Sequence, residues 1–286
     1  MTYVDDAFAN LKGQLEITQT EKALAKRRHT EIRDVVAAAW QLEDHFLTGS
    51  YRRETKTKRL KDVDIFVVID AKGPQAGLRQ SGPAALLAAL KVILDEKYDL
   101  VVIDRMACTV SFGSEEEIVS FDVVPAFKRA GGGWEIPDTD RGWIATNPKR
   151  HHEMTTKKND ACGGMYVPFV KMVKGANREL GDMVEPSFLI EVIALDRVSE
   201  PFGTFQDELN WFFATAAEEV LNDWPDPVGL GPNVNSMTAV ERRSAGDGLR
   251  GAQAIAESAV WLEDQGKERA AVEEWRKLFG WRMPRP

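Results

Sequence analysis

Residues 62–70, with the sequence DVDIFVVID, decide the fold of this chain. The run is rich in β-branched and aromatic residues and is bounded by aspartates, which predicts a β-strand. Residues two apart point to the same face of a strand, so the carboxylates of Asp62 and Asp64 share one face. Neighbouring carboxylates repel each other, and a hard divalent cation relieves that repulsion. Because the ligands are oxygens only, the pair favours Mg²⁺ or Mn²⁺ over zinc.

A third carboxylate, Asp122, lies within a second apolar run, Ile118–Val124, which also predicts a strand. An aspartate in such surroundings is costly unless it is paired or bound to a metal. Three carboxylates on neighbouring strands can hold two metal ions for in-line phosphoryl or nucleotidyl transfer. The alternative is structural: Asp62 and Asp64 begin a strand at its solvated end, and Asp122 pairs with a lysine.

A turn and a basic segment precede the first strand. Gly49 allows the backbone to approach a phosphate closely, and the hydroxyl of Ser50 and the following amides can donate to its oxygens. Residues 52–61 then hold six Lys/Arg against one Glu. Such a run is usually a solvated loop, but beside Gly49 and Asp62 it lowers the local negative potential and guides polyphosphates to an acidic protein.

The length predicts roughly two domains, and the composition is that of a folded protein. The 286 residues are 43% hydrophobic and 29% charged, which excludes a largely disordered or collagen-like chain. A net charge of −8 argues against stable binding of duplex nucleic acid. No apolar run approaches the roughly 20 residues that cross a bilayer, so no membrane partner is expected. With two cysteines and no pattern of a signal peptide, we expect a cytoplasmic protein without a disulfide framework or a four-thiolate zinc site.

The pattern along the chain separates strands from helices. It predicts helix up to about residue 46, a loop at 72–83, a helix at 84–97, strands at 100–103 and 108–113, and a loop from 131 to about 143. Beyond about residue 160 it predicts helices at Tyr166–Leu180, Ser187–Leu195, Thr204–Asn222 and, in pieces, Asn235–Trp281. This order predicts an α+β protein with a mixed α/β lobe followed by a helical lobe.

The order of these motifs is similar to that of a known superfamily. Gly49-Ser50, the basic segment with Thr55, the pair Asp62 and Asp64, and the later strand aspartate together resemble the DNA-polymerase-β-type nucleotidyltransferases. Residues 143–151 (WIATNPKRH) and Asp226-Pro227 make the chain similar to the cGAS/DncV-like nucleotidyltransferases (CD-NTases), whose helical part resembles that of oligoadenylate synthases.

The resemblance implies a fold and a set of site residues. A nucleotidyltransferase core with a mixed sheet and an N-terminal helix is expected at 1–160, a helical domain at 161–286, and an active site in the cleft between them. The family's lysine falls on Lys174, with Lys171 as a substitute one turn earlier, because Ala176 stands where members often carry an aromatic residue. The implied roles are catalysis and metal binding for Asp62, Asp64 and Asp122, and nucleotide binding for Gly49, Ser50, Lys174 and Ser187.

The resemblance also implies an activity. It is the synthesis of a cyclic di- or trinucleotide from nucleoside triphosphates, ATP among them, with Mg²⁺ or Mn²⁺. The product would activate an effector in bacterial anti-phage (CBASS) signalling, with an accessory protein as a regulator. Two alternatives stay open: a related nucleotidyltransferase that modifies tRNA or protein, and a non-catalytic nucleotide-binding scaffold. The sequence leaves base preference, ring size and phosphodiester linkage open.

Overall fold

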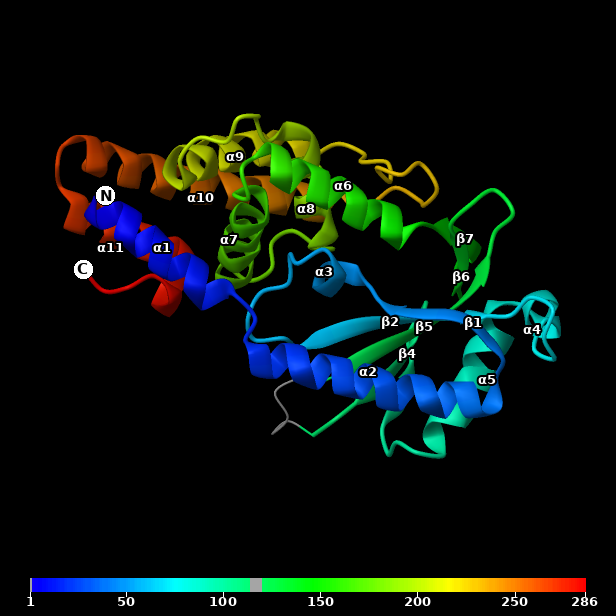
Figure 1. Ribbon diagram of the computed structural model, residues 1–286. Helices are drawn as coiled ribbons and strands as arrows, with labels where there is room; N and C mark the ends of the chain where they lie inside the picture. Colours follow the sequence, from blue (N-terminus) through cyan, green and yellow to red (C-terminus); the bar gives the residue numbers. More distant parts are fainter. Residues whose placement is uncertain (1, 114–119) are drawn as a thin grey trace. The chain divides into compact units, whose positions relative to one another are not determined.

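The computed structural model describes residues 2–113 and 120–286 (Figure 1). Contacts between Cα atoms divide the chain into two compact units. One is formed by Ile17–His152 and Val228–Pro232, and the other by the residues up to Glu16, Glu153–Pro227 and Asn233–Pro286. The first helix, α1 (Tyr3–Leu15), belongs to the second unit, whereas the sequence grouped it with the strands.

The first unit is built on a mixed sheet, as the sequence predicts, and the strand order in this sheet is β1-β2-β5-β4-β3. Strands β2 and β5 pair in parallel, and the other pairings are antiparallel. A hairpin of β6 and β7 extends the sheet from β5. The strands of the described residues are β1 (Leu42–Leu47), β2 (Asp62–Ile69), β3 (Val101–Ile103), β4 (Cys108–Ser111), β5 (Ser120–Lys128), β6 (Trp134–Asp138) and β7 (Gly142–Thr146).

Strand β2 separates a packed core from the functional face. Its odd-numbered residues Val63, Ile65, Val67 and Ile69 are completely buried, in one cluster with apolar residues of α2 (Gln19–Ala39) and α5 (Pro83–Asp95). Its even-numbered residues alternate to the opposite face. There, Phe66 and Val68 join a smaller cluster that includes residues of β5 and β6. The two aspartates therefore lie on the face that α2 and α5 do not cover.

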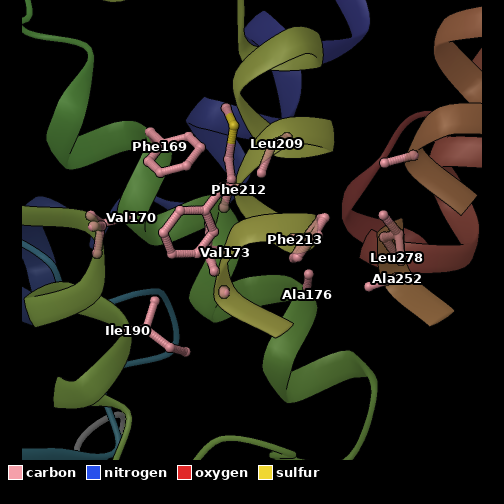
Figure 2. Packing of buried hydrophobic residues seen from close by; sticks show 14 of the residues in the cluster. Phe169, Val170, Val173, Ala176, Ile190, Leu209, Phe212, Phe213, Ala252 and Leu278 are labelled. Atoms are coloured by element: carbon pink, nitrogen blue, oxygen red, sulfur yellow. The ribbon is translucent and has the colours of Figure 1, made fainter. Parts of the chain in front are cut away.

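The second unit is helical and has its own core. Figure 2 shows Phe169, Val173, Phe212 and Phe213 packed together with the small residue Ala176. Among the described residues, no helix is both long and apolar enough to span a membrane. The helices of this unit are α1, α7 (Tyr166–Glu179), α8 (Phe188–Arg197), α9 (Phe205–Glu219), α10 (Ala239–Asp264), α11 (Glu268–Phe279) and the short η1 (Gly280–Arg282). Helix α6 (Pro148–Ala161) has residues in both units. The short helices α3 (Gly49–Arg52) and α4 (Gly77–Ser81) belong to the first unit.

Four predicted elements differ from the structure in their limits. The loop predicted at 72–83 contains the short helix α4 and the first residue of α5. The first helical block ends at Ala39 rather than near Phe46, because Leu42–Leu47 pairs antiparallel with β2 as an edge strand. The loop predicted at 131–143 contains β6 and part of β7. Its glycines lie at the ends of these two paired strands, and Pro137 lies within β6. Helix α6 begins at Pro148, before the predicted start of the helical texture. The start of the strand predicted at Ile118–Val124 lies outside the described residues.

Candidate active site

The three aspartates come together because β2 and β5 pair in parallel. In this pairing Asp64 stands directly beside Asp122, and Asp62 beside Ser120. Neighbouring positions in a register point to the same face of the sheet, so the three carboxylates share one surface. The structure therefore unites the residues that the sequence singled out on separate strands.

Burial and like charge raise the pKa values of two of these groups. The pKa of Asp64 rises from its ordinary 3.8 to about 6, first because burial disfavours the charged form and second because Asp122 lies nearby. Burial also raises the pKa of Asp122, while the hydroxyl of Thr109 donates a 2.6 Å hydrogen bond to its Oδ1 and opposes that rise. A raised pKa of this origin indicates carboxylates that a cation would stabilise.

The metal-free protein should lose stability as the pH rises from about 4 to about 6. In this window the folded chain binds more protons at Asp64 than the unfolded chain, because its folded pKa is the higher one. At 1.36 kcal/mol per pKa unit, the full loss is about 3 kcal/mol. Urea unfolding in EDTA at pH 4.5 and 7.5 measures about two thirds of this loss, because Asp64 of the unfolded chain is already mostly ionised at pH 4.5. Asp64→Asn should stabilise the protein more at pH 7.5 than at pH 4.5, and equal effects at both pH values would contradict the assignment.

Lys56 and Asp62 form an ion pair that the sequence did not predict. Nζ of Lys56 lies 2.6 Å from Oδ2 of Asp62. The structural alternative pairs Asp122 with a lysine, whereas in the structure the hydroxyl of Thr109 donates a hydrogen bond to Asp122. Lys56 belongs to the basic segment 52–61, whose composition was the available signal; nothing in the sequence distinguished Thr109.

The Gly49-Ser50 turn, at the start of α3, is fitted closely against Asp64. Gly49 has a φ of +61°, and a Cβ added there would lie 1.8 Å from Oδ2 of Asp64. The backbone N–H of Thr48 donates to the carbonyl of Asp64 at 2.9 Å, which joins the turn to β2. Ser50 is partly buried, and its carbonyl accepts from the N–H groups of Thr55 and Lys56 at 3.0 and 3.1 Å. The turn thus lies beside the carboxylates, where a phosphate and a metal would be handled together.

The donor set of this site fits a divalent cation. Oxygen-only carboxylate ligands are those that Mg²⁺ and Mn²⁺ take. Within residues 2–113 and 120–286, however, no three or more His, Cys, Asp or Glu side chains are arranged so that they could hold a metal ion together. Lys56 and Thr109 instead bind two of the three carboxylates.

Lys174 and Ser187 belong to the helical unit. Nζ of Lys174, on α7, donates a 2.6 Å hydrogen bond to Oε1 of Glu191 on α8, and both side chains are buried. Lys171 forms a similar pair with Glu16, also at 2.6 Å. Ser187 is exposed and immediately precedes α8 without capping it through its side chain. Their nucleotide-binding roles stay predictions.

Fold and site together define a nucleotidyltransferase: a mixed sheet carries three carboxylates beside a Gly-Ser turn. Comparison with known families agrees, since residues 1–159 match the Second Messenger Oligonucleotide or Dinucleotide Synthetase domain. The chain belongs to this family and is a cGAS/DncV-like nucleotidyltransferase.

Individual proteins are similar to this chain in sequence or in fold. A probable cyclic nucleotide synthase of Bacillus cereus (strain VD146) is 25% identical over 270 residues, covering 82% of this chain and 81% of the relative. The structure of the Bradyrhizobium diazoefficiens CD-NTase CdnG in complex with GTP has a TM-score of 0.77 at 16% identity, covering 99% of this chain and 97% of that one. CdnC of E. coli MS115-1 with ATP has a TM-score of 0.73 at 18% identity, covering 97% and 98%.

Proposed function

We propose that this chain joins nucleoside triphosphates into a cyclic di- or trinucleotide, with Mg²⁺ or Mn²⁺ as its cofactor. The observation that carries the proposal is the trio Asp62, Asp64 and Asp122 on paired strands beside Gly49-Ser50, in the segment that matches the synthetase family. The Bacillus cereus relative, named as a probable cyclic nucleotide synthase, and the related structures with GTP or ATP support the same class of product and substrate.

The chemistry divides among the residues as follows. When bound, a divalent cation lowers the pKa of a ribose hydroxyl and stabilises the charge on the transferring phosphate. Asp62, Asp64 and Asp122 supply the oxygens that would hold it. Gly49 admits a phosphate to the backbone, and Ser50 supplies a hydroxyl and an amide that would fix its oxygens. We propose an effector in anti-phage signalling as the target of the product, with an accessory protein as a regulator.

Incubation with labelled triphosphates tests this function. The purified chain receives each labelled NTP with Mg²⁺ or Mn²⁺, and the mixture is then treated with phosphatase. Label that resists phosphatase indicates a cyclic product and supports the proposal. Label transferred to added tRNA or to protein would contradict the proposal and indicate a nucleotidyltransferase that modifies tRNA or protein. The absence of any product would favour a non-catalytic nucleotide-binding scaffold.

Lys174 needs a paired substitution, because its removal also disturbs the fold. Lys174→Met alone removes the lysine partner of the buried Glu191, which should lower the stability by up to about 3–5 kcal/mol. Adding Glu191→Gln should recover most of that loss. If Lys174 binds the triphosphate, the double variant retains its fold and has a KM for NTP raised at least several-fold, as measured by initial rates.

The matched control is the double variant Lys171→Met with Glu16→Gln. It removes a neighbouring ion pair, in which Nζ of Lys171 also lies 2.6 Å from Oε2 of Glu16. We expect this variant to keep the wild-type KM. The reverse pattern, a raised KM only in the Lys171 pair, would move the nucleotide contact by one helical turn and would require Ser187 to be reassigned as well.

A further inference from the structure

Lys56 is embedded beside the carboxylates rather than extended into solvent. Its side chain is 12% exposed, and its Nζ lies 2.6 Å from Oδ2 of Asp62. An ion pair with a hydrogen bond of this length belongs to the stronger class of hydrogen bonds. The charge of Lys56 also lowers the pKa values of Asp64 and Asp122. One ammonium therefore offsets repulsion across the whole carboxylate trio.

The backbone of Lys56 is fixed by the turn that precedes it. Its N–H donates to the carbonyl of Ser50 at 3.1 Å, and the N–H of Thr55 donates to the same oxygen at 3.0 Å. At the far end of the segment, the N–H of Leu60 donates to Oε1 of the buried Glu21 at 2.8 Å. The segment is thus anchored on both sides of Lys56. The four-carbon side chain of a lysine can still swing, so its ammonium can leave Asp62 without movement of the backbone.

We propose that the Lys56 ammonium is an internal counter-ion that occupies Asp62 in the metal-free protein and leaves it when a divalent cation binds. The inference rests on the proposed metal role of the three aspartates. A cation of this kind binds carboxylate oxygens at about 2.0–2.1 Å, and an ammonium held at the same carboxylate repels it. Lys56 thereby stabilises the empty site and weakens the affinity for metal.

Chemical reactivity of the lysine gives a direct test. The wild-type chain is acetylated briefly with an NHS ester in EDTA and, separately, with saturating Mn²⁺ and no nucleotide, and Lys56 is quantified by mass spectrometry. We expect Mn²⁺ to increase the labelling of Lys56 several-fold, because the ammonium is released from Asp62. Lys61, which is exposed in the same segment, should be labelled equally in both conditions. Unchanged labelling of Lys56 at saturating Mn²⁺ would overturn the proposal.

Substitution of the lysine gives an independent measurement. In Lys56→Met, Mn²⁺ binding followed by electron paramagnetic resonance should tighten by about tenfold, since one nearby positive charge is removed. The melting temperature in EDTA should fall, and the stabilisation by Mn²⁺ should increase. Lys61→Met, which removes a charge from the same segment, should change the dissociation constant less than twofold. Weaker or unchanged Mn²⁺ binding in Lys56→Met would refute the counter-ion role.

These outcomes separate this inference from the proposed function. A wild-type chain that binds no Mn²⁺ and makes no nucleotide product would refute the proposed function and with it the role of Lys56. A chain that binds Mn²⁺ and makes product, but whose Lys56 is equally reactive with and without Mn²⁺, would refute the counter-ion alone.

Discussion

Replacing Asp62 and Asp64 together by asparagine should reduce product formation by at least about 1,000-fold. Loss of the proposed metal ligands should remove several kcal/mol of transition-state stabilisation, and each 1.4 kcal/mol changes the rate tenfold. The fold should survive, because Asp64→Asn relieves the repulsion from Asp122 while Asp62→Asn retains an oxygen that can accept from Lys56. Product is measured as phosphatase-resistant label, and folding as thermal unfolding in EDTA.

The other end of the same strand supplies the matched control. Asp70 directly follows β2, and its Oδ1 accepts from the N–H of Lys72 at 2.9 Å. Asp70→Asn removes one carboxylate at the opposite end of β2 from Asp62 and Asp64, so we expect wild-type activity. Comparable rates in the Asp62/Asp64 double variant and in the wild type would refute the metal assignment and the mechanism built on it.

Gly49→Ala should have the second-largest effect. The new Cβ would lie 1.8 Å from Oδ2 of Asp64, far inside van der Waals contact. Because Asp64 belongs to the paired strand β2, relief of the clash must rotate its carboxylate or shift the turn. Misplacement of a reacting group by about 1 Å costs on the order of 100-fold in rate, so we expect a loss of at least that size. Initial rates at saturating NTP and Mg²⁺ measure it.

A control at a second glycine distinguishes the effect of the steric clash from the effect of backbone strain. Gly132 also has a positive φ, +89°, but a Cβ added there would meet no atom within 4 Å. Gly132→Ala should therefore lower stability modestly and leave the rate unchanged. If Gly49→Ala retained the wild-type rate, the close fit between the turn and Asp64 would have no part in catalysis.

The strand parts of the site are predictable because strand geometry is local. Alternation along β2 determines that Asp62 and Asp64 share a face, and an aspartate in an apolar run marks Asp122. The sequence pattern does not predict the edge strand β1. It predicts that the preceding helix continues to about residue 46, whereas residues of β1 pair with β2. Its residues pair with residues 18 to 27 positions further along the chain, a distance over which local periodicity carries no information.

The polar partners of the carboxylates are not predictable in this way. Lys56 reaches Asp62 only because Ser50 and Glu21 anchor the two ends of a loop that is rich in lysine and arginine. Composition shows that such a loop is basic but cannot select one of its cations. Thr109 reaches Asp122 through the β4–β5 register, which depends on how the two strands align.

The alternation of β2 also determines where this chain can change in length. Deletion of one residue within the strand would turn Asp62 and Asp64 toward α2 and α5, and would expose apolar side chains on the catalytic face. Both folding and chemistry would fail at once, so no partly functional intermediate lies on that path. Residues 72–83 lie beyond the strand, so a change of length there does not reverse the faces on which the side chains of β2 lie. We therefore expect homologues to differ by insertions there and to keep the spacing of the two aspartates fixed.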